Sequence, residues 1–374
     1  MPRLLIVLFA TFFSILAAFL VLFGGLALLG LPVKLPSAPA VPASAAVFPS
    51  KIRMGVLGDS DSQSYQDHLM FASDASLRGG PFRATTYQWT EVLARLRGDQ
   101  IDFGEWGAWG TGWMRAFVDE ALGNLARTPP KEDYRYNFAI SSAPCKALMG
   151  SKQRQARRLV DLMDREPEAW RGGVVVIRSG VTVIGTDDFL DRLARDPNAP
   201  DAVNEISACA NAVGDAVAVI RERHPDTYIA LIGILSNADW SVDFERWQSA
   251  KEIANITSGL DRFDNALRKL AATDRHIAFF DDRAWFAGLW GTRDAEGRPA
   301  YKTVRFAPGW EVTNTSGDDP HNAIVGDGHA GVAWNVLWAQ NLVNKLNASF
   351  GLHIRPIEDG EVVRFLEPSF AAHG

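Results

Sequence analysis

Cysteine and concentrated positive charge are both scarce in this sequence. Its 374 residues include only two cysteines, Cys145 and Cys209, whose spacing is not that of metal ligands. Each is interpreted as a small buried hydrophobe, with one bridge between the two as the alternative. The formal net charge is −6, and the sequence has no Lys/Arg block of the kind that follows a phosphate backbone. We therefore expect neither a disulfide framework nor a nucleic-acid partner.

Nucleotide and metal fingerprints are absent as well. Glycine and tryptophan alternate over residues 104–113, but the glycine spacing is that of neither a dinucleotide-binding turn nor a P-loop. We expect no cofactor and no metal ion. Trp106 and Trp109 are candidates for stacking against the sugar rings of a substrate, and the alternative is that they fill a core.

A long apolar run is present at the N-terminus. Residues 4–31 contain no charged side chain and lie between Arg3 and Lys34. The apolar core of a secretory signal usually has about 7–15 residues and a spanning helix needs about 20, so this length predicts a signal anchor over residues 1–31. A cleaved signal peptide is the alternative, because residues 43–45 (Ala-Ser-Ala) resemble a cleavage site.

The rest of the chain divides by composition. Residues 32–50 are rich in Pro, Ala and Ser and predict a linker. Residues 51–374 are long enough for one large α/β domain, and the chain has the 47% hydrophobic and 22% charged residues of a globular protein. The charges around the apolar run favour a domain outside the cytoplasm, held at the membrane by the N-terminal helix, or secreted if the signal is cleaved.

Short apolar runs alternate with helical patterns along residues 51–374. This alternation is typical of βαβ units and predicts a mostly parallel sheet covered by helices on both faces. Ligands of such sheets bind beyond the carboxyl ends of the strands. The predicted strands are Ile52–Leu57, Ile101–Phe103, Tyr136–Ile140, Val174–Ile177, Tyr228–Ile234 and Ile277–Phe280, and the predicted helices lie around Trp89–Leu96, Met114–Leu125, Lys146–Met163, Ala202–Arg223 and Leu260–Leu270.

Two polar turns carry residues suited to nucleophilic catalysis. Ser60 follows the first predicted strand in a Gly-Asp-Ser turn, where its hydroxyl can face a cleft, and a helix N-cap is the alternative. Asp327 and His329 precede an apolar helical stretch near the C-terminus. A histidine there can reach a serine at the strand ends, and a carboxylate beside it fixes the imidazole tautomer. An incidental surface histidine is the alternative.

Together these turns resemble the SGNH, or GDSL, family of serine hydrolases, which has its nucleophile in an N-terminal Gly-Asp-Ser and an Asp/His pair near the C-terminus. The family's first block is matched by residues 56–60 (Val-Leu-Gly-Asp-Ser), and its second and third blocks resemble residues 136–143 and 174–182. The resemblance covers residues 52–346. It implies a flavodoxin-like three-layer α/β/α sandwich with a mostly parallel sheet. It also implies acyl-ester chemistry, with Ser60 as nucleophile, His329 as base and Asp327 as the partner of His329.

The chain departs from the family pattern at three places. Ser142 stands where the second block has an oxyanion glycine, and Thr182 stands where the third has asparagine. The predicted oxyanion donors are therefore the backbone N–H groups of Ser60 and Ser142 and the Thr182 hydroxyl, with Asn137 as the substitute for Thr182. In addition, Asp327 precedes His329 by two residues, whereas the family spacing is three.

Two further assignments stay open. Asp318 and His321 have the family spacing and form the alternative pair, although His321 lies far before the helical stretch. Arg178 ends the predicted strand of the third block and is a candidate for binding a substrate carboxylate. An ion pair between Arg178 and a nearby acid, Asp187 or Asp188, is the alternative.

These patterns predict an extracytoplasmic serine hydrolase that acts on an acyl ester of a small molecule, a glycan or a lipid. The alternatives are an O-acyltransferase of a cell-envelope polysaccharide and a catalytically weak binding protein with the same fold. Hydrolysis and transfer share every step up to the acyl-enzyme, so the residues alone do not separate them.

Overall fold

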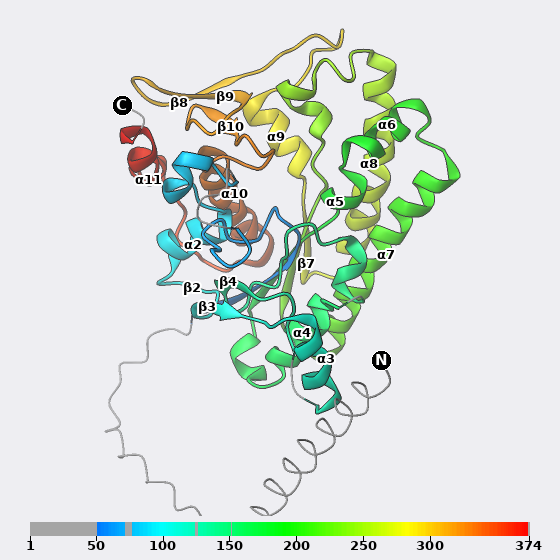
Figure 1. Cartoon of the computed structure of the whole chain (residues 1–374), viewed down its shortest axis with the longest axis vertical. Coiled ribbons are helices and arrows are strands. Elements are labelled where there is room, and N and C mark those ends of the chain that lie inside the picture. Colours follow the sequence, from blue (N-terminus) through cyan, green and yellow to red (C-terminus); the bar gives the residue numbers. More distant parts are fainter. Residues whose placement is uncertain (1–50, 72–76, 124–125, 151, 373–374) are drawn as a thin grey trace, which may run out of the picture. The chain divides into compact units, whose positions relative to one another are not determined.

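The computed structural model describes residues 51–71, 77–123, 126–150 and 152–372 (Figure 1). The predictions for residues 1–31 and 32–50 lie outside these ranges. Five strands form one parallel sheet in the order β2-β1-β5-β6-β7. They are β1 (Ile52–Gly58), β2 (Ile101–Asp102), β5 (Val174–Arg178), β6 (Tyr228–Ile232) and β7 (Ile277–Phe280).

The central strands are apolar on both faces, so both faces of the sheet need a covering layer. Every residue of β5 is buried. Successive side chains of a strand point to opposite faces. Val174 and Val176 accordingly pack in one hydrophobic cluster, and Val175 and Ile177 pack in the other. The predicted three-layer α/β/α arrangement with a mostly parallel sheet is confirmed.

Helices from the two ends of the chain cover one face, and helices from its middle cover the other (Figure 1). A capping box at Ser249 and Glu252 begins the helix that precedes β7, and Gly351 in the left-handed conformation ends the long helix near the C-terminus. The first layer holds α2 (Trp89–Arg97), α9 (Asp282–Trp290), α10 (Val332–Phe350) and α11 (Asp359–Ala371), and the second holds α4 (Gln155–Met163), α5 (Val181–Ile184), α6 (Asp187–Arg195), α7 (Pro200–Arg223) and α8 (Ala250–Ala271).

Smaller elements lie beside these layers. An antiparallel pair, β3 (Trp106–Trp109) and β4 (Lys131–Tyr134), flanks the helix α3 (Trp113–Ala121) in the sequence. A three-stranded sheet directly precedes the loop that carries Asp327 and His329. Its strands are β8 (Thr303–Ala307), β9 (Trp310–Ser316) and β10 (Asn322–Ile324), and the short 3-10 helices are η1 (Gly80–Thr85), η2 (Cys145–Leu148), η3 (Pro167–Trp170), η4 (Asn237–Asp239) and η5 (Ser241–Asp243).

Among the residues that the structure describes, one helix is long and apolar enough to cross a membrane by length and composition, and it is α7. Its side chains Ile206, Val213 and Ile220 are buried in the second cluster. A long helix that covers a sheet needs such an apolar stripe. The stripe of α7 is therefore accounted for by the core of the domain.

Cys145 and Cys209 form a disulfide, with their Cα atoms 5.1 Å apart. The single bridge, which the sequence left as the alternative, is thus the arrangement found. It joins η2, which begins three residues after Ser142, to the middle of α7. The bridge therefore ties the segment beside one predicted oxyanion donor to the second helical layer.

Candidate active site

A cavity of about 260 Å³ opens at the carboxyl ends of the parallel strands. Strand order reverses next to β1, which has β2 on one side and β5 on the other. Such a switch point is where open α/β sheets bind their ligands. The lining residues are Ser60, Asp61, Ser141, Ser142, Val181, Thr182, Gly185, Thr186, Leu235, Asn237, Trp240, Gly328 and His329.

Ser60 reaches this cavity because β1 ends in a glycine. Gly58 has a φ of 154°, and a Cβ atom there would lie 1.8 Å from the carbonyl oxygen of Arg178. The chain then turns at Ser60, and residues 60–71 form turns and bends rather than a helix. Ser60 therefore does not cap a helix, and its hydroxyl is left to face the cavity.

Asp59 fastens this turn to the neighbouring strand. Its carboxylate accepts hydrogen bonds from the backbone N–H of Gly180, at 3.1 Å, and of Asp61, at 3.2 Å. Burial, together with the negative charge of Asp61, raises the pKa of Asp59 to about 7. These hydrogen bonds hold the turn that carries Ser60 against the end of β5.

His329 and Asp327 lie together, as predicted. The distance from His329 Nδ1 to Asp327 Oδ1 is 3.0 Å. Burial alone would raise the pKa of Asp327, but hydrogen bonding to His329 and the charges of His329 and Arg78 outweigh burial and hold that pKa well below its usual range. Asp327 is therefore ionised, which is the state that stabilises an imidazolium. Among the described residues, the hydrogen bonds of the His329 side chain run to Asp327 and Arg78, and none joins it to Ser60.

Arg78 is a site residue that the sequence did not indicate. Its side chain is only 3% exposed and forms an ion pair with Asp327. The backbone N–H of Arg78 also donates to Asp327 Oδ2, at 2.9 Å, and Nη2 donates to the Ser141 hydroxyl, at 3.3 Å. Arg78 has a φ of 58° and precedes two glycines that also have positive φ, Gly79 and Gly80. This tight turn delivers the guanidinium to the Asp327–His329 pair.

The position of Arg78 restricts the tautomer of His329. Arg78 Nη1 is 2.7 Å from His329 Nδ1. A guanidinium has only N–H donors, so Nδ1 cannot donate to it. If Nδ1 carries the proton, as a catalytic base requires, that proton is directed to Asp327, and the guanidinium keeps its hydrogen bonds to Asp327 and Ser141 and its position over the Phe71 ring.

Two backbone N–H groups are available to an oxyanion. Neither the N–H of Ser60 nor that of Ser142 donates to another of the described residues. Ser142 has a φ of 63°, in the left-handed region that costs an L-residue roughly 1–2 kcal/mol and that glycine adopts freely. This conformation explains a glycine at that position in the family, and serine still presents its N–H.

Thr182 lines the cavity but uses its hydroxyl elsewhere. The hydroxyl donates to the carbonyl oxygen of Ala143, at 2.6 Å. A hydroxyl has one hydrogen, so in this arrangement Thr182 has none for an oxyanion. Asn137, the predicted substitute, is also engaged, because its amide donates to the Ser62 carbonyl and to Asp133. The structure therefore leaves the two backbone groups as donors.

Replacing Thr182 by valine tests whether the Thr182 hydroxyl bonds Ala143 rather than an oxyanion. Thr182→Val keeps the side-chain shape and removes the bond to Ala143, so we expect the free energy of unfolding to fall by about 1 kcal/mol. Turnover of a short-chain aryl ester should fall by less than about ten-fold, because no transition-state contact is lost. Steady-state kinetics and thermal unfolding give both values. A fall of about 10²–10³ in kcat with unchanged stability would return the hydroxyl to the oxyanion site.

Arg178 does not line the cavity, and its predicted role in substrate binding is corrected. Its buried guanidinium donates to Asp282 Oδ2, at 2.8 Å, and to the Asp61 carbonyl, at 3.0 Å. The alternative was an ion pair with a nearby acid. An ion pair is found, but the acid is Asp282 at the start of α9 and not Asp187 or Asp188. A buried guanidinium requires a buried carboxylate, and Asp282 supplies it.

Trp106 and Trp109 also lie outside the cavity that holds Ser60. Trp106 is exposed on β3, packs edge-on against Tyr134 and lines a separate open hollow of about 610 Å³. The indole N–H of Trp109 donates to the Asp133 carbonyl, at 3.0 Å. Any stacking of sugar rings on these tryptophans would therefore take place away from Ser60.

The alternative pair Asp318 and His321 is separated from the cavity. His321 Nδ1 is 2.7 Å from Asp319 Oδ1, and its Nε2 is 3.1 Å from the Gly309 carbonyl. Asp318 accepts a hydrogen bond from the backbone N–H of Gly326, at 3.0 Å. These placements favour His329 as the base, with Asp318 holding the loop that leads to it.

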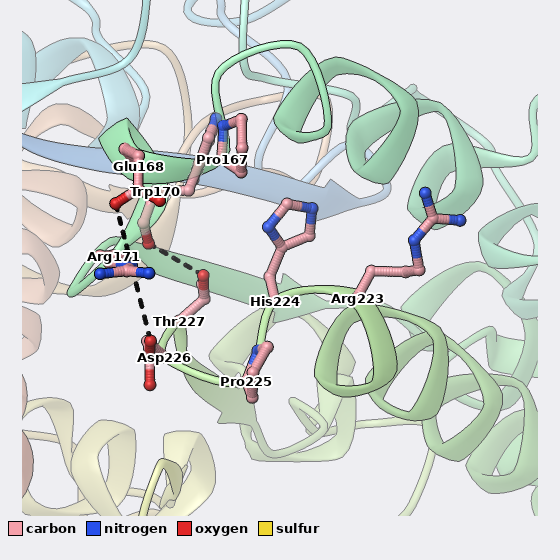
Figure 2. Close-up of a pocket in the computed structure, with 9 residues that line it drawn as sticks. All are labelled: Pro167, Glu168, Trp170, Arg171, Arg223, His224, Pro225, Asp226 and Thr227. Atoms are coloured by element: carbon pink, nitrogen blue, oxygen red, sulfur yellow. Dashed lines mark hydrogen bonds and ion pairs between the residues drawn. The ribbon is translucent and has the colours of Figure 1, made fainter.

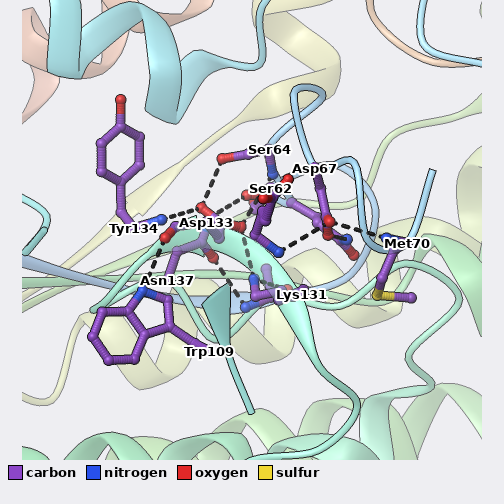
Figure 3. A network of polar contacts seen from close by, with 12 residues as sticks. Ser62, Ser64, Asp67, Met70, Trp109, Lys131, Asp133, Tyr134 and Asn137 are labelled. Atoms are coloured by element: carbon purple, nitrogen blue, oxygen red, sulfur yellow. Dashed lines mark hydrogen bonds and ion pairs between the residues drawn. The ribbon is translucent and has the colours of Figure 1, made fainter. Parts of the chain in front are cut away.

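A buried polar network supports the segment that carries Ser142 (Figure 3). Asp133 is its centre and accepts hydrogen bonds from the Ser64 hydroxyl, at 2.6 Å, and from Lys131 Nζ, at 2.7 Å. Lys131 also donates to the Ala139 carbonyl, at 2.5 Å. Asn137 donates to the Ser62 carbonyl, at 2.7 Å. The network thus connects the turn after Ser60 to the strand-like segment that ends at Ser142.

A second hollow lies at the opposite, amino ends of β5 and β6 (Figure 2). It measures about 150 Å³ and is lined by residues 167–171 and 223–227. The Arg171 guanidinium bridges Glu168 and Asp226 there, and the Thr227 hydroxyl donates to the Trp170 carbonyl. These polar groups form ion pairs and hydrogen bonds with one another. The lining of the hollow contains no serine or cysteine that could act as a nucleophile.

The wall of the cavity that holds Ser60 and His329 also includes side chains that belong to none of the sequence motifs. Asn237 and Trp240 follow β6 and place an amide and an indole in the lining beside the apolar Leu235. Asn237 Oδ1 and Trp240 Nε1 are buried and have no partner among the described residues. Within the same residues, no group of three or more His, Cys, Asp or Glu side chains is arranged to hold a metal ion.

No protein-family model matches the chain, and no curated protein sequence matches it. Solved structures do match in part. A carbohydrate esterase family 2 enzyme with a carbohydrate-binding domain, from Corynascus thermopiles (Myceliophthora fergusii), is 15% identical, with a TM-score of 0.37, and the match covers 85% of this chain and 69% of that one.

Two lipases give similar values. The extracellular lipase of Streptomyces rimosus is 15% identical with a TM-score of 0.33, and the match covers 66% of this chain and 86% of the lipase. The lipase Lip_vut3 from a goat rumen metagenome is 13% identical with a TM-score of 0.29, over 67% of this chain and 90% of the lipase. At such identities and TM-scores we assign neither a family nor an activity from these matches.

Proposed function

We propose that this protein is an extracytoplasmic serine hydrolase that cleaves acyl esters. The observation that carries the proposal is the cavity itself. Ser60 and His329, which are far apart in the sequence, line it together, and His329 is bonded to an ionised Asp327. A nucleophile, a base and a carboxylate that orients the base are the parts that acyl transfer through serine requires.

The reaction follows from these parts. The Ser60 hydroxyl attacks the ester carbonyl, its proton passes to His329 Nε2, and Asp327 stabilises the imidazolium. The N–H groups of Ser60 and Ser142 hold the oxyanion. His329 then gives the proton to the leaving alcohol, and a water molecule activated by the same imidazole releases the acid from Ser60.

The cavity favours a short acyl group. Its volume of about 260 Å³ is below the range of roughly 300–1,000 Å³ that larger ligands occupy. Val181, Leu235 and Trp240 give it an apolar wall. An acetyl or similar short ester of a small molecule or glycan therefore suits the site better than a long fatty chain.

The extracytoplasmic location is supported by two separate features. The apolar run at residues 4–31 predicts membrane targeting. The bridge between Cys145 and Cys209 is of a kind that persists in oxidising compartments and is rare in the cytosol.

A fluorophosphonate probe tests the proposed function directly, because it reacts with a serine only when an adjacent base activates it. We expect the probe to label the wild-type chain and the peptide that contains Ser60. Ser60→Ala should abolish labelling. Ser207→Ala serves as the matched control, since Ser207 lies exposed on α7 and its hydroxyl donates to the Val203 carbonyl. A wild-type chain that resists the probe would instead be a binding protein with this fold.

A further inference from the structure

Helix α3 presents its apolar side chains to solvent. Five of the nine large apolar side chains that the described residues leave exposed belong to α3 or to the residue after it. Phe117 is 68% exposed and Leu122 is 71% exposed. With 3.6 residues per turn, the five side chains gather on one side of the helix. They are Trp113, Met114, Phe117, Val118 and Leu122, and we call them the α3 apolar face.

The opposite side of α3 attaches the helix to the domain. Ala116 is the buried residue of α3. Glu120 forms ion pairs with Arg154 and Arg158 at the start of α4. The helix is therefore held by its small and polar side chains, and the outward direction of the α3 apolar face is set by these contacts. An amphipathic helix of a globular protein normally does the reverse and turns its apolar stripe toward the core.

Two basic side chains, Arg115 and Lys152, lie beside the α3 apolar face. Arg115 is exposed and has Asp119 one turn away as its ion-pair partner. Lys152 lies over the Trp113 ring, with Nζ 4.3 Å from the ring centre. Aromatic and aliphatic side chains flanked by Lys and Arg are typical of helices that lie in the surface of a bilayer.

We propose that the α3 apolar face is a docking surface for a lipid bilayer with anionic headgroups. In this arrangement Trp113, Phe117 and Leu122 enter the boundary between headgroups and acyl chains, and Arg115 and Lys152 contact the headgroup phosphates. The proposal does not depend on the hydrolase activity. It depends on the exposed helix and on the apolar run at residues 4–31.

Residues 4–31 favour a bilayer over another partner. The 19 residues from 32 to 50 connect that run to the domain. Fully extended, they reach roughly 65 Å, at about 3.4 Å per residue, so an inserted N-terminal helix keeps the domain near the membrane surface. A second copy of the chain is less suited, because a stable protein interface takes about 20–30 residues a side and this face offers five large side chains.

Photocrosslinking of the full chain tests the proposal. p-Benzoylphenylalanine replaces Phe117 in one sample and Val242 in the other, and both proteins are reconstituted in vesicles of equal parts phosphatidylglycerol and phosphatidylcholine. Val242 is the matched control because it is 53% exposed on η5, away from α3. We expect about ten-fold more lipid adduct from position 117 than from position 242. The charge reversals Arg115→Glu and Lys152→Glu should lower the yield at position 117 several-fold, as should vesicles of phosphatidylcholine alone.

Each other outcome overturns the proposal in a defined way. A crosslinked dimer would identify a second copy as the partner of α3. An adduct between position 117 and a peptide from residues 4–31 would identify the chain's own apolar run as its cover. Equal lipid yields from positions 117 and 242 would leave α3 without specific lipid contact. The same measurement in a Ser60→Ala background needs no catalysis, so its result is separate from that of the fluorophosphonate test.

Discussion

Ser60→Ala should lower the hydrolysis of a short-chain aryl ester by at least about 10³-fold, because the reaction then lacks the nucleophile that forms the acyl-enzyme. Thermal unfolding should hardly change. Among the described residues, Ser60 has one hydrogen bond, which its backbone carbonyl accepts from Gln88, and alanine keeps that carbonyl. Steady-state kinetics and the thermal midpoint, measured on the same preparations, separate loss of chemistry from loss of folding.

The contrary result has a clear meaning. If Ser60→Ala retained most of the activity, the nucleophile would lie elsewhere, and Ser141 and Ser142 are the other serines of the same cavity. If activity and the thermal midpoint fell together, Ser60 would be a structural residue of the turn after β1.

The second large effect distinguishes two histidines. His329→Ala should remove nearly all turnover, by at least about 10³-fold, because no other histidine lines the described cavity. His321→Ala should change turnover by less than about three-fold, since His321 is bonded to Asp319 and packs against Phe370 outside the cavity. The two variants, assayed side by side, also serve as controls for each other.

The pH profile adds an independent check on His329. The pKa of Asp327 lies well below its usual range, so this carboxylate stays ionised throughout an ordinary assay. Asp327 should therefore contribute nothing to the acid side of the kcat/KM profile, whereas Asp59 in the turn of Ser60, whose pKa is raised to about 7, titrates within the assayed range. Retained activity in His329→Ala with loss in His321→Ala would transfer the base to His321 and its carboxylate to Asp318 or Asp319.

The layers of the fold could be predicted from the sequence because the sheet is buried on both faces. The apolar runs at 52–57, 174–177 and 277–280 correspond to β1, β5 and β7 almost residue for residue. Residues 136–140 were also predicted as a strand. They do run along β1, where Phe138 N–H donates to the Val56 carbonyl, but only one bridge forms and no regular strand results.

The strands β8 and β9 and the helix α11 were not predicted from the sequence. The strands β8 and β9 are partly exposed and alternate polar and apolar residues over only four positions each, at 303–306 and 310–313, so they contain no continuous apolar run. Helix α11 follows α10, so the helix after His329 is not the last one of the chain. These elements depend on tertiary contacts more than on local pattern.

The residues of the candidate site also fall into two groups, those that a local motif indicates and those whose partners are distant in the sequence. Ser60, Asp327 and His329 could be named from short motifs because each motif has a fixed local geometry. The role of Arg78 depends on a contact across 249 residues with Asp327, and that of Arg178 depends on one across 104 residues with Asp282. A single sequence gives no measure of such distant partners. The one available signal for Arg78 was the glycine pair after it, which allows a tight turn.

Because of the Cys145–Cys209 bridge, the stability of the protein depends on whether it folds under oxidising or reducing conditions. It closes a span of 64 residues, and a loop of that length contributes about 4 kcal/mol by restricting the unfolded chain. A chain that folds under reducing conditions would build the same two cores but leave the segment after Ser142 held by packing and by the hydrogen bond from Thr182 to the Ala143 carbonyl. Preparations made with and without oxidation would then share one sequence and one topology while differing in how firmly the segment after Ser142 is attached to α7.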